Sequence, residues 1–528
     1  MRYYGSAVLE SEESADLPIR FGKSYAPRGA VTLARDTLVS SAATGLTETA
    51  WGPLATAADS GSWAFLTRRE AERLSGLREG RSFGAFADEW PAEALGGPEE
   101  FLGLLFRRGL VTLDGATAAD PAMFEDSPNI HNEGRLIELL LSEKCNLGCL
   151  YCLAGARPGQ PHMSRETAFL AVDAAYAVDD ERGLTFEYSG GEAFLRWELM
   201  QELTAYIRAH PERRGRPVNI CVQTNGTLFT PERIEWLRAN HVTVGLSLDG
   251  DPESHNVSRP QVNGGESFSR VMRGVDMLQR AGVPFGALVV LNRANAGDPR
   301  KLLDFLTQNG IGSVKVNPIA FLGDARQKWD AMGMEQAEIV AWFKEFLALL
   351  VRRDADLIES NAIDMTRHLV SKRRASRCLR GHCGAGEGFV AVGADGSLYP
   401  CGRATQSPGL KLGNIRDARR IDDPGRENPH VVAIRERRPQ DYDDCRVCPY
   451  RAFCQAGCPA QSYERYGTVR HKTPECAFFK SMYPHLMGWL AHEAAAMSHM
   501  NRRFFAPSGT PLALTSRALL PELQHHAA

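Results

Sequence analysis

Three closely spaced cysteines are the residues of this 528-residue chain best suited to chemistry. The segment SEKCNLGCLYC, residues 142–152, places Cys145, Cys149 and Cys152 in a C-x3-C-x2-C pattern. Cysteine thiolates bind zinc and iron–sulfur clusters, and four of them would close either kind of site. Three ligands therefore leave one metal position open for another molecule. The alternative is a zinc site whose fourth ligand lies elsewhere in the chain, such as His131.

A second group of cysteines lies between residues 378 and 476. Its eight members are Cys378, Cys383, Cys401, Cys445, Cys448, Cys454, Cys458 and Cys476. A pair of zinc ribbons is one interpretation of such spacings. The remaining cysteine, Cys221, stands alone in the apolar run VNICVQ, and we expect it to be a small buried residue in a strand. The other eleven divide into three plus four plus four, which fits one open and two closed metal sites.

The composition sets limits on partners and compartment. A net charge of −3 gives no reason to expect nucleic acid or an anionic membrane as a partner. The sequence contains no apolar run of about 18 residues, so we expect no membrane span. The N-terminus lacks a basic segment followed by an apolar core, which excludes an ordinary secretory signal. We therefore expect a cytoplasmic protein, in which grouped cysteines indicate metal ligands rather than disulfides.

Apolar strand patterns alternate with amphipathic helix patterns between residues 136 and 320. The expected strands are LIELLLS, LTFEYS, VNICVQT, VTVGLSL, PFGALVVL and SVKVNPI. Five helical patterns separate them, which predicts a parallel α/β sheet with helices outside and right-handed crossovers. The predicted architecture is a partial (β/α)6 barrel. In such folds the ligand lies at the carboxyl ends of the strands.

Polar motifs follow three of these strands. YSGGEAF, with Gly190, Gly191 and Glu192, ends the second strand; QTNGTL ends the third and SLDG ends the fourth. Glycines allow close backbone approach, and Glu192 supplies a carboxylate. Each motif alone is weak, since G-G-E can be an ordinary turn. All of them, however, lie on the same face of the sheet as the three cysteines.

The combination of these motifs over about residues 137–320 resembles the radical S-adenosylmethionine (SAM) superfamily. The resemblance implies that Cys145, Cys149 and Cys152 hold a [4Fe–4S] cluster whose open iron binds SAM. It implies SAM contacts from Tyr151 near the adenine and from Gly190, Gly191 and Glu192 at the methionyl amine. It places Ser247 at the ribose, with Asn225 and Arg259 assisting. Ala193 departs from the family's G-G-E-P, at a position whose side chain is not a ligand.

The second cysteine group is similar to the SPASM extension of radical SAM enzymes, through its C-x2-C-x5-C-x3-C core. This resemblance implies two auxiliary [4Fe–4S] clusters, and hence three clusters in all. Cys378, Cys383, Cys401 and Cys458 would hold the first auxiliary cluster. Cys445, Cys448, Cys454 and Cys476 would hold the second. Fully ligated clusters have no site for substrate, so their implied role is electron transfer.

The N-terminal region is expected to be a separate module. In it, Thr67 and Glu70 form a predicted capping box, and Gly109 is expected to end a helix before the strand-like LVTL. We interpret the region as a small α+β winged-helix-like unit that resembles PqqD-like peptide-recognition elements, which bind a leader peptide as an added strand. The predicted division of the chain is a peptide-recognition-like domain at 1–130, a radical SAM barrel at 131–325, a helical bridge at 326–376, a SPASM domain at 377–490 and a C-terminal helix and tail at 491–528. Within the SPASM domain, the charged segment 419–444 is expected to be a surface connection.

The resemblance implies that this is an enzyme, a radical SAM oxidoreductase that modifies a ribosomally synthesised peptide. LPIRFGK, residues 17–23, is similar to the His-Xaa-Ser system and cyclophane-forming maturases, which implies a crosslink between an aromatic carbon and an aliphatic β-carbon. Thioether formation, epimerisation and formylglycine formation remain alternatives, as does a non-catalytic electron carrier. Gly402 follows Cys401 where sulfatase maturases carry an aspartate base, which counts against formylglycine. Implied partners are a precursor peptide and an electron donor such as flavodoxin or ferredoxin, and no catalytic base is assigned.

Overall fold

The computed structural model describes residues 33–500 with internal gaps, together with three short strands nearer the N-terminus. The gaps are residue 44 and residues 93–95, 120–133, 179–181, 371–377 and 379–382. Strands β1 (Arg2–Tyr4), β2 (Ala7–Leu9) and β3 (Lys23–Ser24) form an antiparallel sheet. His131, residues 17–22 of LPIRFGK and the tail 501–528 lie outside the described residues.

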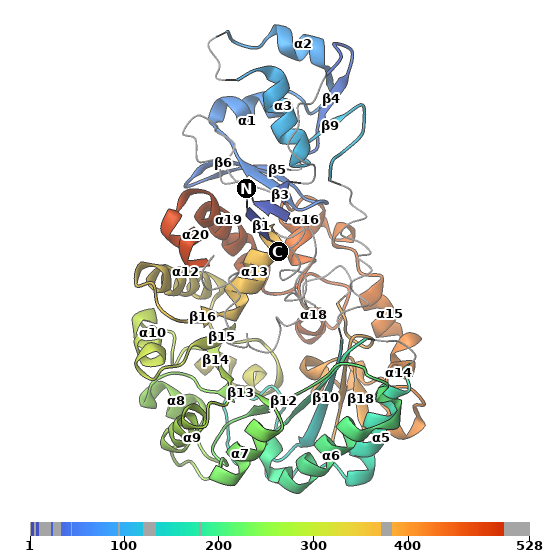
Figure 1. The fold of residues 1–528 in the computed structure, drawn as a ribbon, viewed down its shortest axis with the longest axis vertical. Coiled ribbons are helices and arrows are strands. Elements are labelled where there is room, and N and C mark those ends of the chain that lie inside the picture. The colour runs from blue at the N-terminus through green and yellow to red at the C-terminus, as the bar shows by residue number, and fades with distance from the viewer. Residues whose placement is uncertain are drawn as a thin grey trace.

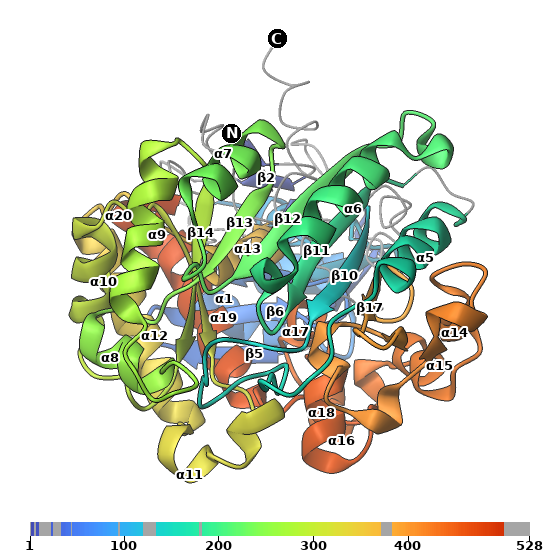
Figure 2. The same ribbon diagram turned by 90° about the horizontal axis from the view of Figure 1, so that it is seen from below.

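Six parallel strands occupy the centre of the largest sheet and follow one another in chain order. They are β10 (Arg135–Ser142), β11 (Leu184–Gly190), β12 (Val218–Thr224), β13 (Thr243–Ser247), β14 (Phe285–Leu291) and β15 (Ser313–Pro318). The connecting helices are α5 (Arg165–Tyr176), α6 (Trp197–Ala209), α7 (Pro231–Ala239), α8 (Pro252–Ser258), α9 (Phe268–Arg280) and α10 (Pro299–Gln308). Figure 2 shows a curved sheet with helices along its outer side. The predicted partial barrel is confirmed.

Successive side chains of each strand point to opposite faces of the sheet, so one face packs against the outer helices and the other, more polar face lines the inside of the barrel. Ile137 and Leu139 of β10 and Phe186 of β11 are buried in the core beneath the helices. The intervening residues Glu138 and Glu187 point the other way, into the barrel, and are only partly buried. The inner face is thus able to receive a polar molecule.

Helix starts are fixed locally by side-chain caps. The hydroxyl of Ser164 accepts a hydrogen bond from the N–H of Thr167 at the start of α5, and Thr230 does the same at the start of α7. Such caps satisfy backbone donors that have no partner within the helix. Helices α5 and α7 can therefore begin abruptly after a strand-end loop.

The chain between the barrel and the second cysteine group is mainly helical. It contains α11 (Trp329–Met332), α12 (Gln336–Arg352), β16 (Ile358–Glu359) and α13 (Ser360–Val370). The short strand β16 pairs with β15 and lengthens the sheet at that edge. Helix α12 buries Phe343, Phe346 and Leu350 and packs against the C-terminal helix α19.

The C-terminal region continues the barrel sheet at its other edge. Strand β17 (Phe389–Val392) pairs with β10 in parallel, and β18 (Ser397–Tyr399) and β19 (Gly413–Asn414) follow, which gives a ten-stranded sheet. The helices of this region are α14 (Asp423–Arg426), α15 (Pro429–Arg435), α16 (Asp443–Arg446), α17 (Arg451–Cys454), α18 (Pro459–Tyr466), α19 (Cys476–His492) and α20 (Ala494–Met500). The second cysteine group is therefore attached directly to the first strand of the barrel.

The expectation that 419–444 is a surface connection is wrong for much of this segment. Val431 and Ile434 of α15 are buried. Asp422 forms a buried ion pair with Arg135, 3.4 Å apart. Arg437 is buried and donates to the carbonyls of residues 456, 457 and 471. The many charged residues of this segment predicted a solvent-exposed loop. Asp422 and Arg437 are buried instead, because ion pairs and backbone carbonyls inside the fold satisfy their charges.

The N-terminal unit contains two further antiparallel sheets. One is β8-β4-β9, from β4 (Leu38–Ser41), β8 (Arg81–Ser82) and β9 (Val111–Leu113), and the other is β5-β6-β7, from β5 (Gly45–Thr49), β6 (Gly52–Ala57) and β7 (Ser62–Phe65). Its helices are α1 (Arg68–Ser75), α2 (Phe83–Asp88) and α3 (Pro98–Arg107). The predicted Thr67–Glu70 capping box is confirmed, and Gly109, with φ +67°, follows α3 as predicted.

The N-terminal unit packs at the end of the molecule near α19, as Figure 1 shows. The Trp63 indole donates to the carbonyl of Leu369 over 2.8 Å, and Arg451 lies 2.5 Å from Asp59. The first contact joins the β5-β6-β7 sheet to α13, and the second joins the turn between β6 and β7 to the cysteine-rich region. Among the residues described, no helix is long and apolar enough to cross a membrane.

Candidate active site at the mouth of the barrel

The first cysteine group lies in the loop after β10. Burial, the Glu192 carboxylate and the neighbouring thiols raise the pKa of Cys145 to about 12. Burial outweighs the opposing effect of Arg259 and raises the pKa of Cys149 to about 12 as well. Cys145 and Cys149 each interact electrostatically with Cys152, so the three thiols lie close together. Thiolates in such a site need a cationic partner, which bound iron would supply.

The glycines at the end of β11 hold the cysteine loop. The N–H of Gly191 donates to the Ser142 carbonyl over 2.6 Å, and that of Glu192 donates to the Lys144 carbonyl over 2.9 Å. A Cβ at Gly190 or Gly191 would overlap these carbonyls, and Gly190 has φ +113°. Glycine is required here because the strand end lies against the backbone that leads to Cys145.

The Glu192 carboxylate is fully buried and joins β11 to β12. It accepts hydrogen bonds from the N–H of Phe194 over 3.0 Å, from the Thr224 hydroxyl over 2.8 Å and from the N–H of Asn225 over 2.9 Å. Burial raises its pKa, and these bonds oppose the rise. In this structure Glu192 fixes two neighbouring strand ends; its contact with a methionyl amine stays a prediction.

Asn225 and Ser247 lie on the same side of the sheet. The Asn225 amide donates to Asn146 over 2.9 Å and lies 3.8 Å from the Cys145 sulfur. Ser247 accepts a hydrogen bond from Gln223 over 3.3 Å. A Cβ at Gly245 would overlap the Gln223 amide, so that glycine leaves room for it. The structure thus brings Asn225 beside the cysteine loop and Ser247 beside Gln223.

Tyr151 and Arg259 meet at Asp249, a residue the sequence analysis did not single out. The Tyr151 hydroxyl donates to the Asp249 carboxylate, and Arg259 forms a buried ion pair with it, 3.1 Å apart. The Arg259 guanidinium also lies 5.3 Å from the centre of the Tyr151 ring. The signal available in the sequence was the SLDG motif itself, in which Asp249 follows Ser247 by two residues.

Four of the eight C-terminal cysteines gather in one place. Burial is the largest cause that raises the pKa of Cys401, and the nearby thiols of Cys458, Cys383 and Cys378 raise it further. Burial, Cys378 and Cys458 likewise raise the pKa of Cys383 to about 12. Arg403 lies near this group of cysteines. Burial lowers the pKa of Arg403, but the nearby thiols of Cys458, Cys378 and Cys401 raise it. These are the four cysteines that the SPASM resemblance assigns to one cluster.

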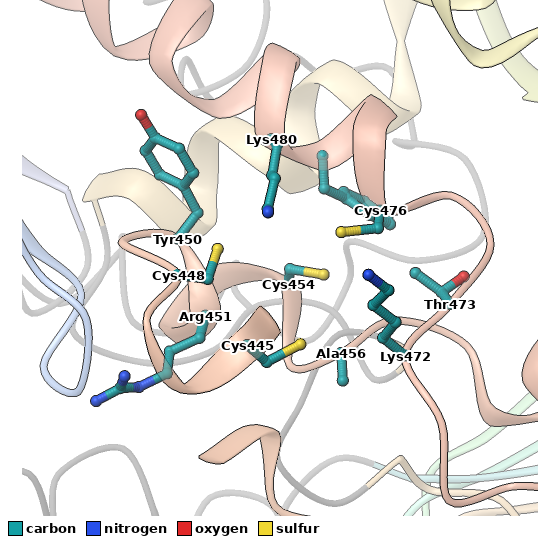
Figure 3. Close-up of a pocket in the computed structure, with 11 residues that line it drawn as sticks. Cys445, Cys448, Tyr450, Arg451, Cys454, Ala456, Lys472, Thr473, Cys476 and Lys480 are labelled. Atoms are coloured by element: carbon teal, nitrogen blue, oxygen red, sulfur yellow. The ribbon is translucent and has the colours of Figure 1, made fainter. Parts of the chain in front are cut away.

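The other four line a separate pocket. Cys445, Cys448, Cys454 and Cys476 surround it together with Lys472 and Lys480. Figure 3 shows the four sulfur atoms and both ammonium groups around the same space. Burial and then Cys476, Cys445 and Cys448 raise the pKa of Cys454. The fold therefore separates the eight residues into two sets of four.

Within the described ranges, no group of three or more His, Cys, Asp or Glu side chains is arranged to hold a single metal ion. Thiolates on one Zn²⁺ lie about 2.3 Å from it, which requires tighter clustering than a four-iron cluster does. Cys221 is buried as expected, and its sulfur lies 3.7 Å from Glu187 inside the barrel.

A partial parallel barrel with a three-thiol loop at its strand ends, accompanied by two four-thiol groups, defines an iron–sulfur enzyme with one open site. A family profile described as the Radical SAM superfamily matches residues 139–306. Those residues form a radical SAM domain, which uses SAM and a [4Fe–4S] cluster as its cofactors.

Similar proteins extend beyond this domain. The serine-type anaerobic sulfatase-maturating enzyme of Bacteroides thetaiotaomicron is 27% identical over 61% of this chain and 81% of its own length. The AdoMet-dependent heme synthase of Methanosarcina barkeri is 25% identical over 66% of this chain and 97% of its own. The solved structure of native anSMEcpe with bound AdoMet and Cp18Cys peptide covers 67% of this chain and 97% of its own, with TM-score 0.58 and 21% identity, which shows a shared fold.

Proposed function

We propose that this enzyme is a maturase that modifies a ribosomally synthesised peptide by joining an aromatic ring carbon to an aliphatic β-carbon. The observation that carries the proposal is the separation of eight cysteines into two sets of four beside a three-cysteine open site. A crosslink of this kind removes two hydrogens from the peptide and therefore needs electron acceptors. Two closed clusters would provide them.

The proposed ligand assignment follows the three cysteine sets. Cys145, Cys149 and Cys152 hold the open cluster, and the two sets of four hold the auxiliary clusters. Bound SAM and the open cluster supply a radical that removes a hydrogen atom from the substrate. Tyr151, Gly190, Gly191, Glu192, Asn225, Ser247 and Arg259 form the SAM site in this proposal. The Asn225 amide beside Cys145 and the Arg259 guanidinium beside Tyr151 favour that arrangement.

A peptide substrate is favoured by the similar proteins. One relative is named a sulfatase-maturating enzyme, and one solved structure of similar fold holds a peptide. Formylglycine formation is therefore the second candidate. It is less favoured because the residue after Cys401 is Gly402, and a Cβ there would overlap the Glu138 carboxylate. The position cannot carry an aspartate without displacing Glu138.

The N-terminal unit is proposed to recognise the leader of the precursor peptide. Its sheets provide strand edges that can pair with an extended peptide. The proposal places the enzyme in the cytoplasm, where flavodoxin or ferredoxin donates the electron that starts each turnover. Because it contacts α13 through Trp63 and the cysteine-rich region through Asp59, the unit would deliver a captured peptide toward the barrel.

The test is anaerobic co-expression with the short peptide encoded by the reading frame adjacent to the gene. We expect that peptide to lose two hydrogens per crosslink, and tandem mass spectrometry to show two residues joined. The purified enzyme should contain about twelve irons per chain, by the ligand count. The Cys145→Ala variant is the matched control and should leave the peptide unmodified.

Three outcomes would contradict the proposal. An unchanged peptide mass with active SAM cleavage would exclude a crosslink. A change confined to one serine or cysteine would favour formylglycine instead. Stoichiometric zinc in place of iron would remove the basis for radical chemistry altogether.

A further inference from the structure

Two glutamates stand side by side on the inner face of the barrel. Glu138 of β10 is the direct register partner of Glu187 of β11, and Glu187 is the partner of Cys221 of β12. Register partners on adjacent strands carry their side chains on the same face. Lys315 of β15 acts on Glu187 electrostatically from across the barrel. The interior thus holds two adjacent carboxyl groups, one thiol and one ammonium group.

The two carboxyl groups cannot both hold a full charge easily. Burial and the adjacent Glu138 raise the pKa of Glu187 to about 8, and burial raises the pKa of Glu138. Adjacent carboxylates in a poorly solvated site tend to share one proton. Such a pair can take up a further proton when a reaction releases one. Both residues are partly accessible, so a molecule inside the barrel could reach them.

Glu138 also connects the proposed SAM side of the site to the first auxiliary set. Its carboxylate accepts a hydrogen bond from the Ser189 hydroxyl over 3.1 Å, and Ser189 directly precedes Gly190. On its other side it accepts from the backbone N–H of Gly402, the residue after Cys401. Glycine at 402 leaves the space that the carboxylate occupies. Two independent donors, Ser189 and Gly402, therefore hold the Glu138 carboxylate between the proposed SAM site and the first auxiliary set of cysteines.

A purely structural role explains this arrangement poorly. Glu359 offers the comparison within the same sheet, since its carboxylate accepts hydrogen bonds from the N–H groups of Val316 and Ala362 and ties β16 to its neighbours. Glu138 and Glu187 instead face each other, and burying two adjacent carboxyl groups costs stability. Residues of the same size without charge would fill the barrel at lower cost.

We propose that Glu138 accepts the proton that leaves the substrate when its radical is oxidised, and that Glu187 is a positioning residue that shares this proton. This inference rests on the proposed function. In the balanced step, an aliphatic C–H loses a hydrogen atom to the deoxyadenosyl group of SAM, and the resulting carbon radical forms a C–C bond to a ring carbon. The ring adduct then gives one electron to an auxiliary [4Fe–4S] cluster and one proton to Glu138, which restores the aromatic ring.

The test uses the full-length enzyme loaded with its clusters, in D2O. Its substrate is the short peptide encoded by the reading frame adjacent to the gene. The Glu138→Gln variant should still form 5′-deoxyadenosine, but the crosslinked product per 5′-deoxyadenosine should fall by about 10²-fold or more, the usual effect of losing a proton-transfer group. Stalled ring adducts that revert to the substrate radical, and are then reduced by one electron, should acquire one solvent deuterium. Gly402→Ala should have the same effect, because its methyl group displaces the Glu138 carboxylate. Glu359→Gln, a matched loss of a buried carboxylate, should keep the wild-type ratio.

Each result decides the inference. A wild-type ratio of product to 5′-deoxyadenosine in both Glu138→Gln and Gly402→Ala, with full iron content, would overturn the role of Glu138 alone. An equal fall in crosslinked peptide and in 5′-deoxyadenosine would also overturn this role, since Glu138 would then act before the substrate loses its proton. Wild-type enzyme that makes 5′-deoxyadenosine without changing the peptide would overturn the proposed function, and this inference with it.

Discussion

Arg259 and Asp249 form an ion pair that is almost wholly buried beneath the first cysteine loop, with Nε and Oδ2 3.1 Å apart. Asp249 also accepts from the Tyr151 hydroxyl and from the N–H of Val290 over 3.0 Å. One carboxylate therefore ties the cysteine loop to β14. Removing its charge leaves a buried guanidinium without its partner.

We expect Asp249→Asn to lower the free energy of unfolding by about 3–5 kcal/mol, the usual cost of breaking a buried pair. Urea denaturation under anaerobic conditions measures this change. Asp276→Asn breaks the exposed pair with Arg280 and is the control, with an expected loss under about 1 kcal/mol. Equal effects of the two substitutions would show that the buried pair does not hold the loop.

Replacing a cysteine of the open site by alanine should have a different effect from replacing a cysteine of an auxiliary site. Cys145→Ala should abolish SAM cleavage, because the cluster proposed for Cys145, Cys149 and Cys152 is the one with the SAM-binding iron. Cys454→Ala should remove about four irons and stop peptide modification while some SAM cleavage remains. Iron analysis and quantification of 5′-deoxyadenosine measure both. Cys221→Ala, outside all three sets, should keep full iron content. If Cys145→Ala still formed 5′-deoxyadenosine, the ligand assignment would be wrong.

The stability of the barrel should depend on pH through His255. Burial, with a smaller contribution from Arg259, lowers the pKa of His255 from 6.5 to about 4, against the opposing effect of Asp249. The ring accepts a hydrogen bond from the N–H of Asp249 and is hydrogen bonded to Ser267. The unfolded state binds the proton more readily, so this contribution is complete above pH 6.5 and is lost as pH falls toward 4. The loss reaches about 3 kcal/mol at 1.36 kcal/mol per pH unit.

Urea midpoints at pH 7, 6 and 5 would measure this dependence. His255→Asn should flatten the change in stability over that interval. His241→Asn is the matched control, since His241 is exposed and has φ +44°, which asparagine tolerates. A wild-type slope in His255→Asn would show that another group causes the acid sensitivity.

Gly488 of α19 should be intolerant of a methyl group. A Cβ there would overlap the ring of Trp51 in the N-terminal unit. Alanine normally stabilises a helix interior by about 0.5–1 kcal/mol relative to glycine, but overpacking here should cost about 1–3 kcal/mol. Hydrogen exchange should show faster opening of β5, β6 and β7. Gly297→Ala, where the methyl group meets open space, should change nothing. Unchanged exchange in Gly488→Ala would mean that the Trp51 contact does not hold the unit.

The sequence by itself determined the strands of the barrel and the spacing of the cysteine groups, because strand periodicity and cysteine spacing are local patterns. The predicted strands match β10 to β15 within one or two residues at each end. Segment 419–444 was misread because charge is a local property, whereas the burial of Asp422 and Arg437 depends on distant partners.

The tertiary structure alone decided which side chains meet. Spacing could not reveal that β17 extends the barrel along β10, nor that Gly402 approaches Glu138 as a result. It also could not show that Arg259 pairs with Asp249 or that Glu138 lies beside Glu187, because strand register arises from long-range packing of the whole sheet. Local patterns thus specified the elements and their chemistry, and long-range packing specified the contacts through which these residues can act together.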